Sequence, residues 1–241
     1  MAPKPVRVLI VDNDSVMRRA LRSSLATHGY AVEEARSGEE AVAGAEQRPP
    51  DLVLLDVNMP GIGGIEACRR LRSIVPQAGV VMVTVCDSEE DKIQALEAGA
   101  DDYVTKPFSL PELHARLRAI TRRLGAQPTG AVLRAGDLEL DTHRSALRKA
   151  GAEVHLSPTE FALLAYLMQH TGVPIEHTRL LRAIWGPEYG CELEYLRTYI
   201  KRLRRKIERD ALHPEYLLTV PWMGYRFCDP TGPAVDLWAA S

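Results

Sequence analysis

The sequence predicts a doubly wound α/β domain followed by a smaller α+β domain. Two features predict this: short apolar runs alternate with amphipathic segments in the first half, and a Gly- and Pro-containing break follows at residues 122–131. A chain of 241 residues fits two domains of about 100 to 120 residues, each able to bury a core. We expect domains at 1–121 and 132–228, a linker at 122–131 and a tail at 229–241.

The strands of the first half are expected to be parallel and buried. Apolar runs of four to six residues bounded by turn signals suit such strands, and helical segments between them suit crossover connections. The strand candidates are VRVLIV, DLVLLD, GVVMVTV and DYVTK, within a sheet of five strands. The helix candidates are SVMRRALRSSLATHG, IEACRRLRSI, EDKIQALEAGA and LPELHARLRAITRR.

The second half predicts a small antiparallel sheet, three helices and a hairpin. LRAGDLELDTHRSALRKAGAEVHL consists of short alternating segments separated by turns. The helical patterns are PTEFALLAYLMQHTG, HTRLLRAIWG and LEYLRTYIKRLRRKIERD. The hairpin candidate is YLLTVPWMGYRF, with its turn around Met223 and Gly224.

Composition excludes several classes of protein. No apolar run approaches the roughly 20 residues needed to span a bilayer, so we expect a cytoplasmic protein without a membrane partner. Cys68, Cys86, Cys191 and Cys228 lack the spacing of a zinc site. Residues 1–121 contain 14 Lys/Arg and 18 Asp/Glu, whereas residues 122–241 contain 16 and 14, so the second half is the better partner for a polyanion.

Polar residues end four of the predicted parallel strands, and such ends meet at one edge of the sheet. They are Asp12 with Asn13 and Asp14, then Asp56, Thr84 and Lys106. Two converging carboxylates suit Mg²⁺, and a carboxylate beside the ion can attack a phosphoryl group. Asp56 would be this nucleophile, while Thr84 and Lys106 would contact the phosphoryl oxygens. The plainer alternative is that Asp12 and Asp56 cap helices and that Lys106 extends to solvent.

The segments VLIVDNDSVMRRAL, DLVLLDVNMPGIGGIE, VVMVTV and GADDYVTKPFSLPEL resemble the signature segments of response-regulator receivers, over residues 6–121. The resemblance implies a flavodoxin-like fold with five parallel strands and phosphorylation of Asp56. It implies that Asp12, Asn13, Asp56 and the Asn58 backbone carbonyl hold Mg²⁺. It further implies that Thr84, Tyr103 and Lys106 form the switch, and that a sensor histidine kinase donates the phosphoryl group.

Two residues depart from the receiver pattern. Asn13 stands where an acidic metal ligand is usual, so Mg²⁺ binding should be weakened unless Asp14 compensates. Val85 stands where Ala or Gly is usual and should narrow access to Asp56. A degenerate receiver that acts without phosphorylation is therefore an alternative.

The resemblance also implies a homodimer through the last two helices of the receiver and the strand between them. The charged residues expected on this face form the pairs Lys92 with Glu112, Asp102 with Arg116, Asp101 with Arg123, and Glu97 with Arg118. Ordinary solvated charges are the alternative, because exposed pairs contribute only about 0 to 1 kcal/mol each.

The run RTYIKRLRRKIER contains seven basic residues and one acidic residue. Leu196, Ile200, Leu203 and Ile207 recur at helical spacing and predict one buried stripe. The accessible residues are then expected to be Arg197, Lys201, Arg202, Arg204 and Arg205. With the preceding short helix from His177 to Trp185, this predicts a helix-turn-helix that places its second helix in the DNA major groove.

The block LSPTEFALLAYLM, WGPEYG and LLTVPWMGYRF resembles the winged-helix effector domain of the OmpR/PhoB class. The resemblance implies DNA contacts from Tyr199, Arg202 and Arg204, wing contacts from Thr219 and Arg226, and an RNA polymerase contact at 186–194. The wing lacks the usual arginine and has Trp222 in place of glycine. Pro221 with WGP and EYLRTY resembles the KdpE branch, which regulates potassium-uptake operons.

Three functions compete at this point. The first is a transcription factor, not an enzyme, that is switched by phosphotransfer from a kinase. The second keeps DNA binding but dispenses with phosphorylation. The third is an aspartate-nucleophile phosphatase, which we discount because such enzymes usually carry a general-acid Asp where this chain has Asn58.

Overall fold

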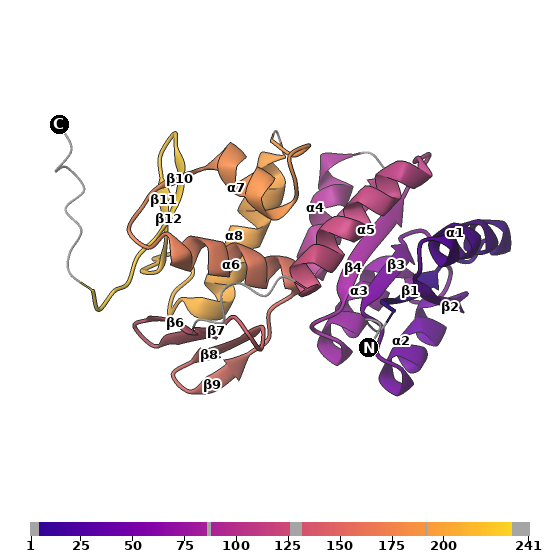
Figure 1. Ribbon diagram of the computed structural model, residues 1–241, viewed down its shortest axis with the longest axis horizontal. Coiled ribbons are helices and arrows are strands. Elements are labelled where there is room, and N and C mark those ends of the chain that lie inside the picture. The colour runs from indigo at the N-terminus through magenta and orange to yellow at the C-terminus, as the bar shows by residue number, and fades with distance from the viewer. Residues whose placement is uncertain (1–4, 86–87, 126–131, 191, 233–241) are drawn as a thin grey trace. The chain divides into compact units, whose positions relative to one another are not determined.

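The computed structural model describes residues 5–85, 88–125, 132–190 and 192–232, and it divides into two compact units. The first contains the parallel sheet and the second contains the remaining strands and three helices (Figure 1). Within the described residues, no helix combines the length and apolar character that crossing a bilayer requires.

The first unit is a doubly wound α/β fold with the parallel strand order β2-β1-β3-β4-β5, which confirms the predicted fold class. Its strands are β1 (Arg7–Val11), β2 (Ala31–Ala35), β3 (Leu52–Asp56), β4 (Gly79–Thr84) and β5 (Asp102–Thr105). Its helices are α1 (Ser15–Thr27), α2 (Gly38–Gln47), α3 (Gly63–Ile74), α4 (Glu89–Ala98) and α5 (Leu110–Gly125).

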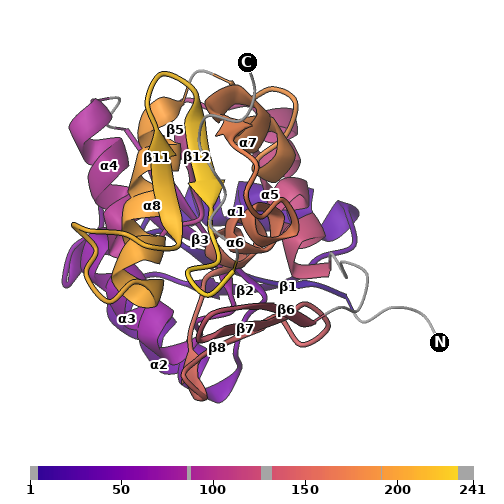
Figure 2. The same ribbon diagram turned by 90° about the vertical axis from the view of Figure 1, so that its left-hand side faces the viewer.

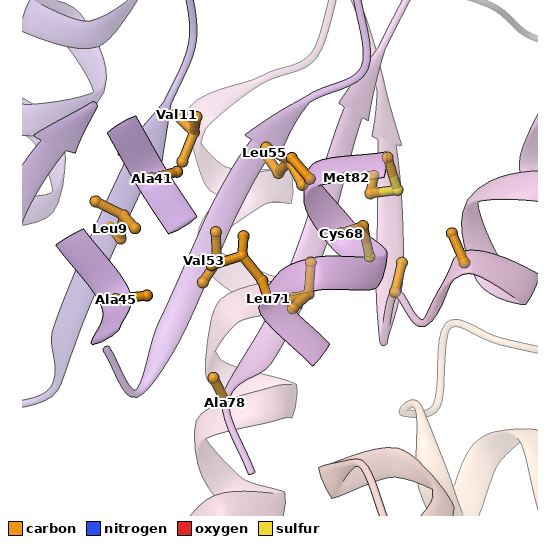
Figure 3. Close-up of a cluster of buried hydrophobic side chains, with 14 of the residues drawn as sticks. Leu9, Val11, Ala41, Ala45, Val53, Leu55, Cys68, Leu71, Ala78 and Met82 are labelled. Atoms are coloured by element: carbon orange, nitrogen blue, oxygen red, sulfur yellow. The ribbon is translucent and has the colours of Figure 1, made fainter. Parts of the chain in front are cut away.

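Alternation along the strands builds two cores, one on each face of this sheet. In β1, Leu9 and Val11 pack with α2, α3 and α4, whereas Val8 and Ile10 pack with α1 and α5. Figure 3 shows the first of these cores, where Cys68 and Leu71 of α3 meet side chains of β3 and β4. Helices on both faces explain why β1, β3 and β4 are almost uniformly apolar.

The edge strand β2 has the sequence AVEEA, which carries no apolar run. Neither β2 nor α2 stands among the segments that the pattern singled out. As an edge strand, β2 pairs only with β1 and leaves Glu33 exposed, so it has less need of apolar residues.

Helix α5 continues through Gly125, so the predicted linker at 122–131 starts too early. Arg122 and Arg123 form its last turn, where basic side chains complement the helix dipole. The predicted tail also starts too early, because the Asp229 carboxylate accepts a hydrogen bond from the Gly136 amide at 3.0 Å. Residues 126–131 and 233–241 lie outside the described part of the chain.

The second unit is a winged-helix fold, as predicted. One antiparallel sheet has the order β6-β7-β8-β9 and the other has the order β10-β12-β11. The strands are β6 (Val132–Ala135), β7 (Leu138–Asp141), β8 (Ala146–Lys149), β9 (Ala152–Val154), β10 (Ile175–Glu176), β11 (Leu217–Val220) and β12 (Gly224–Phe227). The helices are α6 (Pro158–Gln169), α7 (His177–Ile184) and α8 (Leu193–Ile207).

Aromatic packing holds α7 against α8 in this unit. Trp185, which is fully buried after α7, makes edge contacts with Tyr199 at 5.1 Å and Tyr195 at 5.9 Å between ring centroids. The hairpin of β11 and β12 lies next to α8 (Figure 2), and its turn consists of Pro221, Trp222 and Met223 because Val220 pairs with Gly224.

Candidate functional site

Three of the predicted site residues meet at the carboxyl edge of the parallel sheet. The Lys106 ammonium lies 3.1 Å from Asp12 Oδ2 and 3.2 Å from Asp56 Oδ1. Asp12 and Asp56 are both buried, and they follow or end neighbouring strands β1 and β3. The ammonium therefore bridges two carboxylates that would otherwise repel each other at close range.

The helix-capping alternative does not hold for these two carboxylates. Asp14, not Asp12, caps α1 by accepting a hydrogen bond from the Val16 amide at 2.7 Å. Helix α3 has no side-chain cap at its N-terminus, and Asp56 lies upstream of it at the end of β3. Because the Asp14 carboxylate is engaged in capping and exposed, the structure gives no support to its compensating for Asn13.

The environment of Asp56 disfavours its charged form. Burial raises the pKa of the Asp56 carboxyl, the Lys106 ammonium lowers it, and the Asp12 carboxylate raises it again, for a net upward shift. Burial alone would lower the pKa of Lys106, but contacts with Asp12 and Asp56 outweigh burial and raise it. Lys106 therefore stays charged, and the pocket holds one cation between two acidic groups.

The remaining predicted residues of this site differ in how far they are buried. Thr84 ends β4 with a buried side chain, and its carbonyl accepts a hydrogen bond from the Lys106 amide at 2.6 Å. Asn13 and Asn58 are exposed, and the Asn58 backbone hydrogen-bonds with Asp56. Val85 is 60% exposed, so its side chain extends mainly into solvent. Tyr103 is half-buried with the Lys92 ammonium 5.4 Å from its ring centroid.

Arg18 is a neighbour of this site that sequence reasoning missed. Its guanidinium donates to the Asp12 carbonyl at 2.6 Å and lies 3.4 Å from the Glu34 carboxylate. The sequence feature that could have indicated Arg18 is its position one helical turn after Asp14. Arg18 thus links the end of β1, helix α1 and the edge strand β2.

Several residues of the predicted dimer face have partners within the same chain. Arg116 lies 3.1 Å from both Asp102 and Glu112. The Asp101 carboxylate lies 2.7 Å from Arg72 of α3. Glu97 and Arg118 are exposed, and Arg123 belongs to the last turn of α5. The pairing of these residues between two copies stays a prediction.

In the second unit, α8 presents part of its basic run to solvent and buries the rest. Arg197, Lys201 and Arg205 are exposed and lie four residues apart, hence on one face of the helix. Arg197 also forms an ion pair with Glu194 on the preceding turn.

The expectation that Arg202 is accessible is wrong. Arg202 is buried 2.9 Å from Glu160 of α6, and its guanidinium stacks over the Tyr199 ring at 5.0 Å. Lys206 lies 2.6 Å from the same carboxylate of Glu160. Tyr199 is also fully buried, so neither Tyr199 nor Arg202 presents its side chain to DNA. A buried acid that needs positive partners explains why these side chains turn inward.

The hairpin contains the other predicted DNA contacts. Arg204 is half-buried and donates to the Leu217 carbonyl at 2.6 Å and to the Thr219 hydroxyl at 3.0 Å, which fixes the hairpin to α8. Thr219 is exposed, whereas Arg226 is buried. Of the segment 186–194, residues 186–190 follow α7, with Tyr189 buried against Tyr195, residues 193–194 begin α8, and Cys191 lies outside the described residues.

Comparison with known proteins decides the family. Residues 8–118 match the response regulator receiver domain, and residues 151–227 match the family described as transcriptional regulatory protein, C terminal. The transcriptional regulatory protein KdpE of Mycobacterium tuberculosis is 43% identical over 222 residues, which cover 91% of this chain and 98% of that protein. The chain belongs to the OmpR/PhoB family of two-component response regulators. It is a DNA-binding transcription factor, so the phosphatase alternative is set aside.

Other members of the OmpR/PhoB family align over nearly the whole chain. The KDP operon transcriptional regulatory protein KdpE of Escherichia coli is 40% identical over 223 residues, with coverage of 91% of this chain and 98% of its own. The crystal structure of DrrB, a Thermotoga maritima OmpR/PhoB homolog, is 31% identical with a TM-score of 0.50 and covers 93% of this chain and 100% of its own. Both units of this regulator thus belong together in one family architecture.

Proposed function

We propose that transfer of a phosphoryl group from a sensor histidine kinase to Asp56 switches the DNA binding of this regulator. One observation carries the proposal: at the edge of the sheet, the Lys106 ammonium lies 3.1 Å from the Asp12 carboxylate and 3.2 Å from the Asp56 carboxylate. A buried carboxylate, a cation for the phosphoryl oxygens and a second carboxylate are the groups that phosphotransfer to aspartate needs.

In the proposed step, an Asp56 carboxylate oxygen attacks phosphorus, a new O–P bond forms, and the bond from phosphorus to the kinase imidazole breaks. The imidazole leaves with the bonding electrons and takes up a proton from solvent. Lys106 neutralises the added negative charge, and the Thr84 hydroxyl donates to a phosphoryl oxygen. Thr84 and Tyr103 would then pass the change of state to α4 and β5.

The acidic residues fit a magnesium ion. Mg²⁺ uses one or two carboxylates together with phosphate and water, and the buried Asp12 and Asp56 supply two carboxylates. We propose Asp12, Asp56 and the Asn58 carbonyl as its ligands, with Asn13 contributing at most an amide oxygen. When bound, the ion would neutralise charge on the transferred phosphoryl group.

We propose that α8 enters the major groove of duplex DNA, with Arg197, Lys201 and Arg205 facing the bases and phosphates. Their common exposed face supports this assignment. Thr219 is proposed to contact DNA from the hairpin. Arg204 fits better as a positioning residue, since its guanidinium is committed to β11.

Further partners follow from the family and stay proposals. We propose a receiver homodimer through α4, β5 and α5, an RNA polymerase contact at 186–194 and a cytoplasmic location. The proposed domains are a receiver that extends through α5 to Gly125 and an effector that starts at β6 and includes Asp229. Relatives named KdpE, one of them named for the KDP operon, support control of a potassium-uptake operon.

The second candidate function is DNA binding that does not depend on phosphorylation. The exposed Asn13 favours it, because an amide in place of a carboxylate removes a negative charge from the proposed metal site.

The test compares DNA affinity with and without a phosphodonor. A short duplex would first be enriched from a random library by the full-length protein. The proposal predicts that acetyl phosphate with Mg²⁺ tightens binding of the wild type and leaves Asp56→Asn unchanged. Equal affinity in every condition, even after Asn13→Asp restores a carboxylate, would favour the phosphorylation-independent regulator.

A further inference from the structure

The turn between β11 and β12 places a large aromatic side chain fully in solvent. Trp222 is 103% exposed, and Met223 beside it is 45% exposed. By contrast, Trp185 in the same unit is completely buried. Trp222 and Met223 together form an exposed apolar pair at the end of the hairpin, and an exposed indole offers a large, rigid contact surface to a partner.

The backbone at Trp222 is also unfavourable for this residue type. Its φ is +66°, in the left-handed region that favours glycine. The other non-glycine residues with positive φ in the described chain are Ser145 and Ala150, which have small side chains. Strain of this kind persists where the surroundings impose it, and it gathers at functional sites.

The surroundings do impose this conformation, because the turn is anchored on both sides. The Met223 amide donates to the Val220 carbonyl at 3.2 Å, and the Met223 carbonyl accepts from the His177 amide at 3.3 Å. A Cβ atom on Gly224 would lie 1.9 Å from the Ile175 carbonyl oxygen, so the β10 backbone leaves no room for a side chain at this position of β12. The backbone that carries the indole is therefore anchored at a defined place in the unit.

The charge of the neighbouring surface identifies the partner. Arg204 ties β11 to α8, and α8 carries the exposed basic face of Arg197, Lys201 and Arg205. This face fits the phosphates of nucleic acid, and a helix in the major groove leaves the adjoining hairpin beside the flanking minor groove. The turn between β11 and β12 lacks the usual wing arginine and presents the flat, apolar indole of Trp222 instead.

We propose that Trp222 is a minor-groove wedge, which packs on the sugars or between two bases where the hairpin meets the duplex. Apolar side chains in the minor groove act in this way in other DNA-binding proteins, where they partly unstack a base step and kink the duplex. The inference rests on the proposed DNA binding by α8 and adds a recognition element that depends on groove shape and base-step flexibility.

The experiment uses the full-length protein and the duplex enriched by the wild type. Trp222→Gly removes the indole and suits the positive φ, so the variant should be at least as heat-stable as the wild type. Its affinity for the duplex should fall by roughly 5- to 150-fold, the range seen when a stacked aromatic is removed. The salt dependence should stay unchanged because no charge is lost. Trp222→Phe should recover part of the affinity.

A modified duplex tests whether the indole lies in the minor groove. Inosine in place of guanine removes the 2-amino group from the minor groove and leaves the major-groove edge intact. This change at the base pairs under the hairpin should tighten binding of the wild type and have no effect on Trp222→Gly. Leu212→Ala is the matched control, since Leu212 is 85% exposed but lies outside the hairpin.

The outcomes separate this inference from the proposed function. If the wild type enriches no duplex either alone or with acetyl phosphate and Mg²⁺, DNA binding by this surface fails as a whole. If the wild type binds and Trp222→Gly binds equally well, DNA binding stands and the wedge is refuted. A loss of affinity that is insensitive to inosine would likewise overturn the minor-groove assignment and leave Trp222 for a protein partner.

Discussion

The Arg202 guanidinium lies 2.9 Å from the buried Glu160 carboxylate, so this basic side chain of α8 points into the interior of its own domain. Without Arg202 the buried Glu160 carboxylate keeps only the Lys206 ammonium, 2.6 Å away, so the loss is that of one charged hydrogen bond, about 1.5 to 3 kcal/mol. We expect Arg202→Ala to lower the free energy of unfolding by about this amount, measured by denaturant titration. Arg205→Ala is the control and should change it by less than about 0.5 kcal/mol. Equal stability of the two variants would contradict the structural role of Arg202.

Substitutions on the exposed face of α8 should affect DNA binding and not stability. Arg197→Ala, Lys201→Ala and Arg205→Ala should leave stability nearly unchanged and weaken DNA binding. Where the side chain contacts a phosphate, the slope of log affinity against log salt should shrink by about 1. Fluorescence anisotropy across a salt series measures this slope. Unchanged affinity in all three variants would remove α8 from the DNA interface.

Removing the charge of Asp56 should raise the free energy of unfolding. Its folded-state pKa is raised by burial and by Asp12, despite the opposing effect of Lys106, so the native state holds this proton more tightly than the unfolded chain does. The associated stability is present below the unfolded pKa of about 3.9 and is lost as pH rises through the raised pKa.

We therefore expect Asp56→Asn to raise the free energy of unfolding at pH 7, and the gain to shrink as the pH approaches 4. Denaturant titrations at both pH values measure the difference. Glu46→Gln, which alters an exposed carboxyl on α2, is the control and should have little effect at either pH. A loss of stability at pH 7 in Asp56→Asn would show that the Lys106 contact outweighs burial.

The environment of His114 predicts a second pH dependence of the free energy of unfolding. Its ring stacks on His28 at 3.8 Å between centroids, and its Nε2 lies 2.9 Å from the Ser24 hydroxyl. Burial, together with the charges of His28 and Arg118, lowers the pKa of His114. A lowered folded-state pKa means that stability is complete above the unfolded value of about 6.5 and declines as pH falls through the folded pKa.

The free energy of unfolding should therefore decrease as the pH is lowered from about 7 to 5. His114→Gln keeps a polar group near Ser24 without a titrating ring, so its pH profile should be flatter over this range. Thermal unfolding at a series of pH values provides the measurement. Parallel profiles for the two proteins would assign the pH dependence to other groups.

The parallel sheet and its polar edge could be predicted from the sequence because both depend on local pattern. Apolar runs such as RVLIV and LVLLD allow few alternatives to buried strands, and the residues that follow them must lie at one edge. The strand β2 is harder to place, since an edge strand with two glutamates carries no apolar run.

The inward orientation of Arg202 could not be predicted, because periodicity along α8 does not reveal what packs against it. Helix α8 buries Tyr199 against Trp185 as well as the Leu203 stripe, so its buried surface is wider than one apolar stripe. Glu160 alone gives no signal that it pairs with a residue on another helix. Tertiary contacts of this kind decide which arginines of a basic run reach a partner.

Intact mass spectrometry is the most decisive check on whether Asp56 accepts a phosphoryl group in the pocket formed with Asp12 and Lys106. The full-length protein would be weighed after incubation with acetyl phosphate and Mg²⁺. We expect the wild type to gain one phosphoryl group and Asp56→Asn to gain none. A phosphoryl group on Asp56→Asn would refute phosphorylation at Asp56. So would the absence of a phosphoryl group on both the wild type and the Asn13→Asp variant.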